Sequence, residues 1–465
     1  MVLLTRINHL ETHQASLEIE NMSLKAENLE LRNRLNQNSQ NSNKPPSSDG
    51  LTKKTTHPAI PKEKGKRSGG QSGHKGNTLK MVDIADTQVI HHAPFCPCCS
   101  KVFTSSDVEQ VIQRRQVFDI PKPQIIVTEH QLGIITCCGQ KHKGVFPQGV
   151  NSLVQYGTNI KSLSVLLSVD YKVPFDKIEQ LFSDLYQCSF NESTAISANT
   201  AFFEALAPIE LTIKSKILDS PVVHFDETGM RVDGKLHWFH AACTAFFTYL
   251  FVHRKRGKEA LNSEESLIKD FKKWAIHDCW KSYFDFKSCY HALCNAHIIR
   301  ELDNLIELKS AWALEMKTLL FDLYKLSDKG KLNVPDKPIW IEKYESICQK
   351  ADLEEPLPIK SSEKARGKPK STKGRNLLNR LKTHQEGVLA FAFIDHIPFT
   401  NNQAERDIRC LKTKQKVATS FHTMKGAQNY ARIQGFVSSV RKHKSNVFQQ
   451  INNVFEQKPV VFVAG

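Results

Sequence analysis

The chain lacks any apolar stretch long enough to span a bilayer, since its longest apolar run, AACTAFFTYLFV, is short and interrupted by threonines. It also lacks a secretory signal, because the opening MVLLTRINHLE turns polar after four residues. Both absences argue against membrane and secreted proteins. We therefore expect a cytoplasmic protein with reduced thiols, in which clustered cysteines are metal ligands rather than disulfides.

Acidic residues are in short supply. The 465 residues include 48 Asp and Glu against 64 Lys and Arg, which gives a net charge of +16 and a pI near 9.2. Such an excess of positive charge favours a polyanion as partner, and nucleic acid is the usual one. A soluble protein with a merely basic surface is the alternative. The length and the 40% of hydrophobic residues allow about three domains with sizeable cores.

Residues 1–37 repeat leucine every seven positions, with three polar residues among the five a positions and charges of opposite sign at g and e. This pattern predicts a parallel coiled coil of two strands, and hence a homodimer. A single amphipathic helix packed on its own protein is the alternative. The d residues are Leu3, Leu10, Leu17, Leu24 and Leu31, and the a residues are Ile7, Gln14, Asn21, Asn28 and Leu35.

Residues 38–80 are rich in Asn, Ser, Pro, Gly and Lys, which predicts a flexible basic linker able to follow a phosphate backbone. Residues 81–150 then carry CPCC (96–99) and CCG (137–139), flanked by strand-like segments. We expect a zinc-ribbon-like domain. Because adjacent cysteines fit a zinc knuckle poorly, His130 and His142 are alternative ligands. The expected zinc ligands are Cys96, Cys99, Cys137 and Cys138.

Residues 151–215 show helical patterns separated by Pro174 and by the polar stretch 188–193. Three short helices beside a basic linker predict a helical DNA-binding domain, in which a helix-turn-helix is one arrangement. An ordinary helical bundle is the alternative. Asn191 or Ser193 is expected to cap the third helix.

The stretch PVVHFDETGM (221–230) is a short apolar run that ends in two carboxylates, Asp226 and Glu227. It predicts a buried strand that turns at Thr228–Gly229, followed by two further strands in a meander. A second strand-like piece ends in Asp278. Carboxylates at the ends of neighbouring strands favour a hard cation. A structural role for the strand-end Asp in capping a turn is the alternative.

A strand and a long helix follow, with Cys289, His291, Cys294 and His297 near their junction. These four could form a second zinc site, but we favour packing or positioning of the acids for Cys294 and His297. Together 216–330 form the first part of an α/β core. Residues 331–384 are a basic insertion, since 360–382 contain nine Lys or Arg against one acid.

The second part of the core, 385–445, contains NNQAERDIR, and 446–465 form a C-terminal tail. Thr400 or Asn401 is the expected helix cap. Glu405 borders the apolar stripe of this helix, and Arg406 and Arg409 surround it with positive charge. An acid at the edge of a core, within a basic field, is suited to bind a metal beside a phosphate.

These pieces together resemble the DDE transposases of the insertion sequence 66 family, over nearly the whole chain. The resemblance implies an RNase H-like core, a mixed five-stranded sheet with helices, interrupted by a helical insertion. By this resemblance, the family's acidic triad corresponds to Asp226, Asp278 and Glu405. A C-x2-H pair found in several DDE groups corresponds to Cys294 and His297. Ile135 occupies a position where the family shows a cysteine. The resemblance therefore supports Cys138 more strongly than Cys137 as a zinc ligand. The matching motifs are NSQNSNKPPSSD, GGQSGHKGNT, CPCC…CCG, HFDETG, HDCWKSY, HALCNAHIIREL, NNQAERDIR and KTKQKVATSF.

The implied activity is DNA strand cleavage and strand transfer at the ends of an insertion sequence. Two Mg²⁺ ions, or Mn²⁺ in their place, would lie about 4 Å apart and stabilise the attacking and leaving oxygens. Asp226 would bridge both ions, with Asp278 on one and Glu405 on the other; Glu227 is less suited, since adjacent strand residues point to opposite faces. The partners implied are the element's double-stranded DNA ends, target DNA and accessory proteins of the same element, in a bacterial nucleoid. A catalytically silent, zinc-containing dimeric DNA-binding protein and an RNase H-like nuclease without strand transfer are the alternatives.

Overall fold

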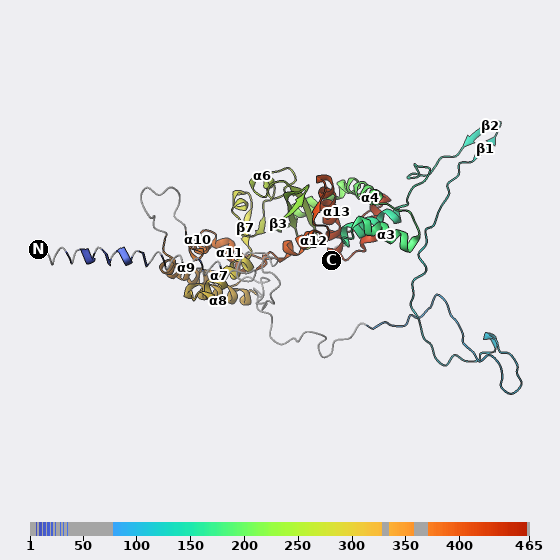
Figure 1. The fold of residues 1–465 in the computed structure, drawn as a ribbon, viewed down its shortest axis with the longest axis horizontal. Helices are drawn as coiled ribbons and strands as arrows, with labels where there is room; N and C mark the ends of the chain where they lie inside the picture. The colour runs from blue at the N-terminus through green and yellow to red at the C-terminus, as the bar shows by residue number, and fades with distance from the viewer. Residues whose placement is uncertain are drawn as a thin grey trace.

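The computed structural model describes residues 78–327, 334–357 and 371–462, together with scattered positions between residues 6 and 35. Figure 1 shows a central body built around a sheet, with helices α7 to α11 gathered beyond strand β7 and α3, α4 and α13 on the other side. Two long arms leave this body, and the β1–β2 hairpin ends one of them. Much of the predicted coiled coil, most of the predicted linker and part of the basic insertion lie outside the described residues.

The sheet of the central body is mixed. Its strands run in the order β5-β4-β3-β6-β7, where β3, β4 and β5 are antiparallel and β6 and β7 are parallel to β3. A short sixth strand, β8, pairs with the far end of β3. The predicted mixed α/β architecture is therefore confirmed. The strands are β3 (Val222–Val232), β4 (Lys235–Cys243), β5 (Thr248–His253), β6 (Trp274–His277), β7 (Tyr290–Leu293) and β8 (Ser420–Phe421).

The turn expected at Thr228–Gly229 is wrong, because β3 continues through it to Val232. The chain turns instead at Asp233 and Gly234, which both have positive φ, as a tight two-residue hairpin requires. Gly229 has another role within the strand. A Cβ there would come within 3.0 Å of a methyl carbon of Leu236 on the neighbouring strand, so the glycine makes room for that side chain.

Helices that precede the sheet in the chain and helices that follow it cover the same face of the sheet. Side chains of α2, α4, α12, α13 and α14 share a hydrophobic cluster with Met230, Phe239 and Leu250 of the sheet. The segment expected to be a tail thus contains a packed helix, and helices of the 151–215 region share a core with the sheet and with α12 to α14. The elements are α2 (Thr158–Val165), η3 (Leu166–Asp170), α3 (Phe175–Tyr186), α4 (Glu192–Ala205), α12 (Asn402–Ala418), α13 (Met424–Lys442) and α14 (Val447–Phe455).

Helix α5 packs on the opposite face, around Val223, Phe225 and Tyr283. The expected third helix of the 151–215 region is two helices, α4 and α5, which meet at Leu206. Asn191 caps α4 as expected, since its side chain accepts a hydrogen bond from the Thr194 N–H. The elements of this face are α5 (Ala207–Asp219), α6 (Lys258–Leu261) and η4 (Lys281–Asp285).

Along the chain, helices α7 to α11 lie between Asp278 and α12. They form a layer that extends the hydrophobic core beyond β7. The single long helix expected after β7 is wrong: the chain breaks at Lys309, which has positive φ, and α8 begins afresh. Glu354 of α9 accepts hydrogen bonds from the Ala311 and Trp312 N–H groups that begin α8. The helices are α7 (Asn295–Glu307), α8 (Ala311–Leu326), α9 (Lys337–Glu354), α10 (Lys373–Thr383) and α11 (Gln385–Phe393).

Residues 81–150 contain little regular structure. Of the expected strand-like segments, 108–120 forms no strand, and 124–136 forms one only at its end, where β1 (Ile134–Cys137) begins. β1 pairs with β2 (Gln140–Lys143), and the 3-10 turn η2 (Ser105–Asp107) lies before them. Apolar side chains of this region, such as Ile112 and Val117, are exposed. A strand needs a partner for its backbone groups, and the described part of this region pairs only β1 with β2 and Phe95 with Val102 in an isolated bridge.

Candidate active site

The register of the sheet brings the first two predicted acids together. β3 and β6 are parallel, and His224 pairs with Ile276. If this register is continued two residues beyond the last pair, Asp226 comes level with Asp278, which directly follows β6; the Asp278 charge also raises the pKa of Asp226. Because side chains alternate along a strand, both acids share a face of the sheet with Met230 and Val232. This is the face that α12 covers.

Asp226 and Asp278 are both half-buried carboxylates with raised pKa values. Burial raises the pKa of Asp226 well above 3.8, and the charges of Glu227, Asp278 and Glu405 raise it further. Burial also raises the pKa of Asp278, although the Trp280 N–H bonded to its Oδ1 at 2.9 Å opposes this. The three predicted triad acids are therefore close enough to act on one another electrostatically. A bound cation would relieve their repulsion.

Glu227 belongs to the other face of the sheet. Its Oε1 lies 2.7 Å from a guanidinium nitrogen of Arg256, and the Tyr283 hydroxyl donates to its Oε2. The Arg256 guanidinium in turn stacks between the rings of Trp238 and Trp280, 4.9 and 4.2 Å from their centroids. Glu227 thus has a cation and a hydroxyl as partners, which fits a structural role and agrees with the opposite-face argument.

Glu405 reaches the same region from α12. Ala404, Ile408 and Leu411 pack this helix on the sheet, and Glu405 lies beside that stripe in the first turn. Asn401 precedes the helix, as expected, but its side chain does not cap it. Instead Asn401 Nδ2 donates to the Phe225 carbonyl at 2.8 Å, and its Oδ1 lies 2.8 Å from His224 Nδ1.

The Glu405 carboxylate does not join the two aspartates in one compact cluster. A carboxylate oxygen of Glu405, a ring nitrogen of His297 and the sulfur of Cys294 all lie within 4.8 Å of one another. Asp226 and Asp278 form no such group with Glu405, although all three acids are described. Cys289 and His291 contact each other elsewhere, 4.0 Å apart, so the alternative zinc set of four residues is not assembled.

Sequence reasoning missed a buried ion pair that fixes α12. Lys442 Nζ on α13 lies 2.5 Å from Asp407 Oδ2, with side chains only 11% and 8% exposed. The same ammonium donates to the carbonyls of Thr244 and Phe247 and to the hydroxyl of Thr248. Asp407 lies two residues after Glu405, so this network holds the helix at the point where the acid is needed. An acid within a helix and a distant lysine carry no sequence signal of their pairing.

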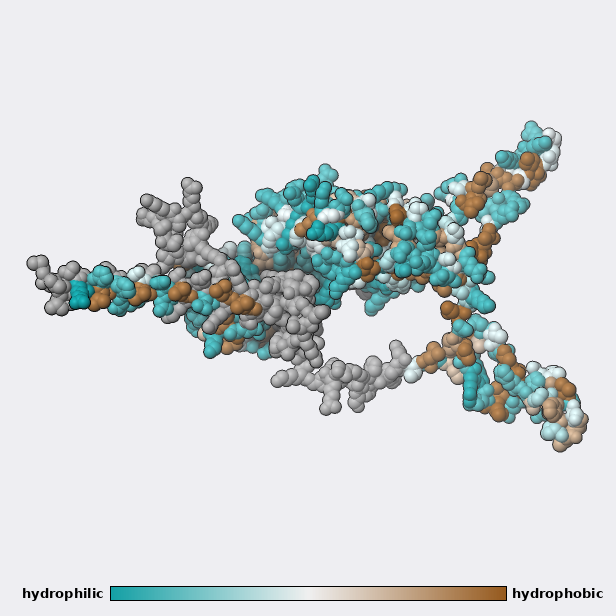
Figure 2. Space-filling view, viewed as in Figure 1, coloured by the Kyte–Doolittle hydropathy of each residue, from teal (hydrophilic) through white to brown (hydrophobic). Residues whose placement is uncertain are grey.

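The outer face of α12 is basic. Arg406, Arg409, Lys412 and Lys416 are exposed, and the Arg406 guanidinium donates a hydrogen bond to Gln403 on its own helix. Lys412 lies close to the carbonyl of Gly229 on β3, at 3.4 Å. Figure 2 shows that the visible face of the central body is largely hydrophilic. These cations therefore border the acids on the solvent side.

The predicted zinc ligands remain in two separate groups. The Cys96 N–H donates to Lys101 O, and backbone N–H groups of Cys99 and Cys98 lower the pKa of the Cys96 thiol. These contacts form a tight turn around Cys96. Cys137 and Cys138 form the end of the β1–β2 hairpin, with sulfurs 3.7 Å apart. Within residues 78–327, 334–357 and 371–462, the two groups do not meet in one cluster.

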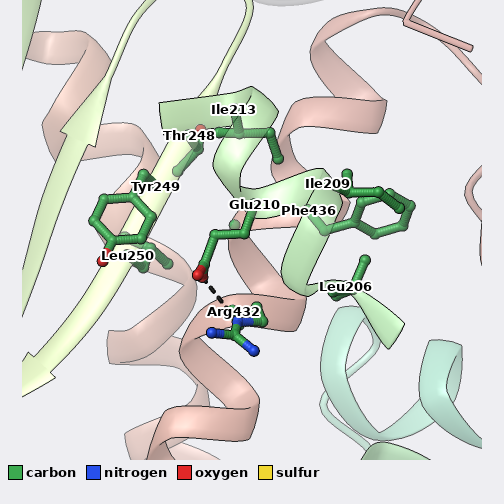
Figure 3. Close-up of a pocket in the computed structure, with 10 residues that line it drawn as sticks. Leu206, Ile209, Glu210, Ile213, Thr248, Tyr249, Leu250, Arg432 and Phe436 are labelled. Atoms are coloured by element: carbon green, nitrogen blue, oxygen red, sulfur yellow. Dashed lines mark hydrogen bonds and ion pairs between the residues drawn. The ribbon is translucent and has the colours of Figure 1, made fainter. Parts of the chain in front are cut away.

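A small cavity lies away from the acids, between α5, β5 and α13. Figure 3 shows it lined by Ile213, Tyr249 and Phe436, with Glu210 paired to Arg432 at its rim. Its one acid already has a cation as partner at 3.0 Å. The chemistry expected at the strand ends therefore does not belong to this cavity.

Comparison with known proteins identifies the family. The model of the family described as "Transposase IS66 family" matches residues 154–429, which include Asp226, Asp278 and Glu405. A family of unknown function matches residues 4–80. No curated protein matches the chain. No helix in the described part of the chain has the length and apolar character to cross a membrane. Since the transposase model covers more than half of the sequence, the chain belongs to the IS66 family of transposases.

Proposed function

We propose that this transposase cleaves DNA at the ends of its element and joins them to target DNA, with Asp226, Asp278 and Glu405 as the catalytic acids. The observation that carries the proposal is the parallel register that sets Asp226 beside Asp278 beneath the helix bearing Glu405. The strand order, three antiparallel strands followed by two parallel ones, supports an RNase H-like core.

The residues fit divalent metal ions. Hard cations such as Mg²⁺ prefer carboxylate oxygens, and Asp226 and Asp278 supply them at one edge of the sheet. Glu405 Oε1 is buried without a hydrogen-bond partner, which is costly unless a cation or donor meets it. Two bound Mg²⁺ ions, or Mn²⁺, would stabilise the attacking and leaving oxygens of the phosphodiester. By this proposal Asp226 faces both ions, while Asp278 and Glu405 each hold one.

The surroundings of the acids suit DNA. Arg406 and Arg409 project from the helix that carries Glu405, so a phosphate bound there would lie beside the acids. The basic segment between α9 and α10 lies mostly outside the described residues, and we propose that it follows the DNA backbone. The cysteine groups at 96–99 and 137–138 are proposed to bind one structural Zn²⁺ in a DNA-binding arm.

Homodimerisation would bring two DNA ends together. The described residues between 6 and 35 are helical, and their leucines are exposed, including Leu17 and Leu24 at about half of full exposure. Figure 2 shows apolar side chains recurring along this helix. We propose that a second copy covers this stripe in a coiled coil, and that the dimer acts with accessory proteins of the same element on the bacterial nucleoid.

A strand-transfer assay tests the catalytic proposal. Purified full-length protein is mixed with paired end DNA and target DNA in Mg²⁺; joined product supports transposition. Cut product alone identifies a nuclease that does not join, and a bound complex alone identifies a silent DNA-binding protein. Asp226→Asn and Glu405→Gln are expected to abolish cleavage while DNA binding stays near wild type. Asp395→Asn, at an exposed acid outside the site, is the matched control.

A further inference from the structure

The cluster of Cys294, His297 and Glu405 has the composition of a transition-metal site rather than a magnesium site. Cys294 precedes α7, and His297 follows it by three residues in the first turn, so that both reach the start of α12. Their ligand atoms and a Glu405 oxygen lie within 4.8 Å of one another. In a tetrahedral zinc site the ligand atoms lie about 3.5 Å apart, so a small contraction completes the set.

Two atoms of the cluster are unsatisfied. His297 Nδ1 and Glu405 Oε1 are both buried and have no hydrogen-bond partner. A buried polar atom without a partner is unfavourable, and a metal ion bound to that atom would satisfy it. The third member is already oriented, because the Asn401 N–H donates to Cys294 Sγ at 3.1 Å. Such outer hydrogen bonds fix metal-ligating side chains.

The donor types select the ion. Thiolate and imidazole favour Zn²⁺ over Mg²⁺, whereas Asp226 and Asp278 offer oxygen only. Glu405 is common to both sets. If its carboxylate binds an ion together with Cys294 and His297, it is withdrawn from the aspartates, with which it forms no compact group in this structure.

We propose that Cys294, His297 and Glu405 bind one Zn²⁺, and that zinc held there inhibits the transposase by keeping Glu405 from the magnesium site. The binding half stands on the cluster alone, and the inhibitory half rests on the proposed function. Cys294 is buried, whereas His297 and Glu405 are partly exposed residues.

Cobalt titration tests the binding half without any activity measurement. Co²⁺ replaces Zn²⁺ in such sites, and a cobalt–thiolate bond gives a charge-transfer absorption band. Metal-free wild-type protein is expected to bind one equivalent of Co²⁺ more than Cys294→Ser. Binding of that extra equivalent should add charge-transfer absorption that Cys294→Ser lacks. His297→Gln and Glu405→Gln should weaken that equivalent at least tenfold. Cys348→Ser, at a buried cysteine of α9, is the control and should match wild type. Equal cobalt binding and equal bands in wild type and Cys294→Ser would overturn the proposal.

Zinc titration of the Mg²⁺-dependent cleavage reaction tests the inhibitory half. Each protein is compared with itself with and without Zn²⁺, so differences in basal rate cancel. Zn²⁺ is expected to lower the cleavage rate of wild type and of Cys348→Ser at least tenfold. It should lower the cleavage rate of Cys294→Ser and His297→Gln only slightly. Equal inhibition of all four would contradict the inhibitory role. If no protein cleaves DNA in Mg²⁺, the proposed function fails, while the cobalt result still decides the binding site.

Discussion

Asn401 Nδ2 donates a hydrogen bond to the carbonyl oxygen of Phe225, one residue before Asp226. The backbone N–H of Asn401 donates to Cys294 Sγ, so this residue joins β3, the start of α7 and the start of α12. Because its amide nitrogen donates, its Oδ1 is the acceptor for His224 Nδ1, which must then carry the proton. Burial lowers the pKa of His224 to about 4, so this imidazole is neutral near neutral pH.

Replacing Asn401 with alanine should misplace Glu405. The change removes both side-chain hydrogen bonds and leaves the Phe225 carbonyl buried without its donor. A displacement of about 1 Å in a catalytic group can cost about 100-fold in rate, and we expect a loss of that order in cleavage. Cleavage rate and DNA affinity are measured together, with Asn402→Ala, at the exposed neighbour, as control. A wild-type rate in Asn401→Ala would show that this connection does not position the acid.

The raised pKa of Asp226 predicts a trade between stability and metal binding. The folded state holds the proton more tightly than the unfolded chain, so stability falls as pH rises from about the ordinary value of 3.8 through the folded-state pKa. Asp226→Asn removes this penalty. Without metal, it should therefore have a higher Tm than wild type near neutral pH, and the difference should shrink in acid. Mg²⁺ should raise the Tm of wild type but not that of Asp226→Asn.

Thermal unfolding across pH, with and without Mg²⁺, checks this expectation. Asp395→Asn again serves as the exposed control and should follow wild type. A lower Tm for metal-free Asp226→Asn near neutral pH would mean that the carboxylate has a partner that outweighs its burial.

The Asp407–Lys442 pair should be essential for stability. Lys442→Met leaves the Asp407 carboxylate buried without its cation, which costs about 3–5 kcal/mol in comparable cases. Adding Asp407→Asn should recover part of this loss, because no buried charge then remains. Denaturant unfolding measures both variants, with Lys425→Met, an exposed lysine of the same helix, as control. If Lys442→Met unfolds like the control, the pair contributes little.

The leucine stripe of the N-terminal helix should control the oligomeric state. Leu17→Asp and Leu24→Asp together introduce charges into the proposed seam, and light scattering should then give half the mass of wild type. Ser16→Asp adds a charge outside the seam and should leave the mass unchanged. An unchanged mass in the double variant would argue that another surface holds the copies together.

Local patterns in the sequence were sufficient for the strands that carry the acids. The apolar run before Asp226 and the shorter one before Asp278 both form strands, and Asn191 caps α4. The turn predicted at Thr228–Gly229 is misplaced because glycine usually indicates a turn. Here Gly229 instead makes room for Leu236 within the sheet. The segments at 108–133 have strand-like composition but no partner strands.

The connections between distant parts could not be predicted in this way. Hydrophobic periodicity shows that a helix buries one face, but it does not name the element that covers it. The packing of α2 and α4 against α13 and α14 is therefore a tertiary fact. The same holds for Glu405 beside Cys294 and His297: the local sequence favours packing or positioning for this pair, and Glu405 comes from another helix. The local sequence indicates Asn401 as a helix cap. It does not indicate that the side chain bonds instead to His224 and Phe225 of β3.

The layer of helices α7 to α11 lies between the second acid and the third in the chain, and β8 and α13, which pack on the sheet, come later still. During synthesis, a ribosome must therefore finish this layer and most of the C-terminal helices before α12 can dock. A truncated or nascent polypeptide holds only two of the three proposed acids in place. If the proposed function holds, a product truncated before α12 lacks Glu405, and we expect it not to cleave DNA.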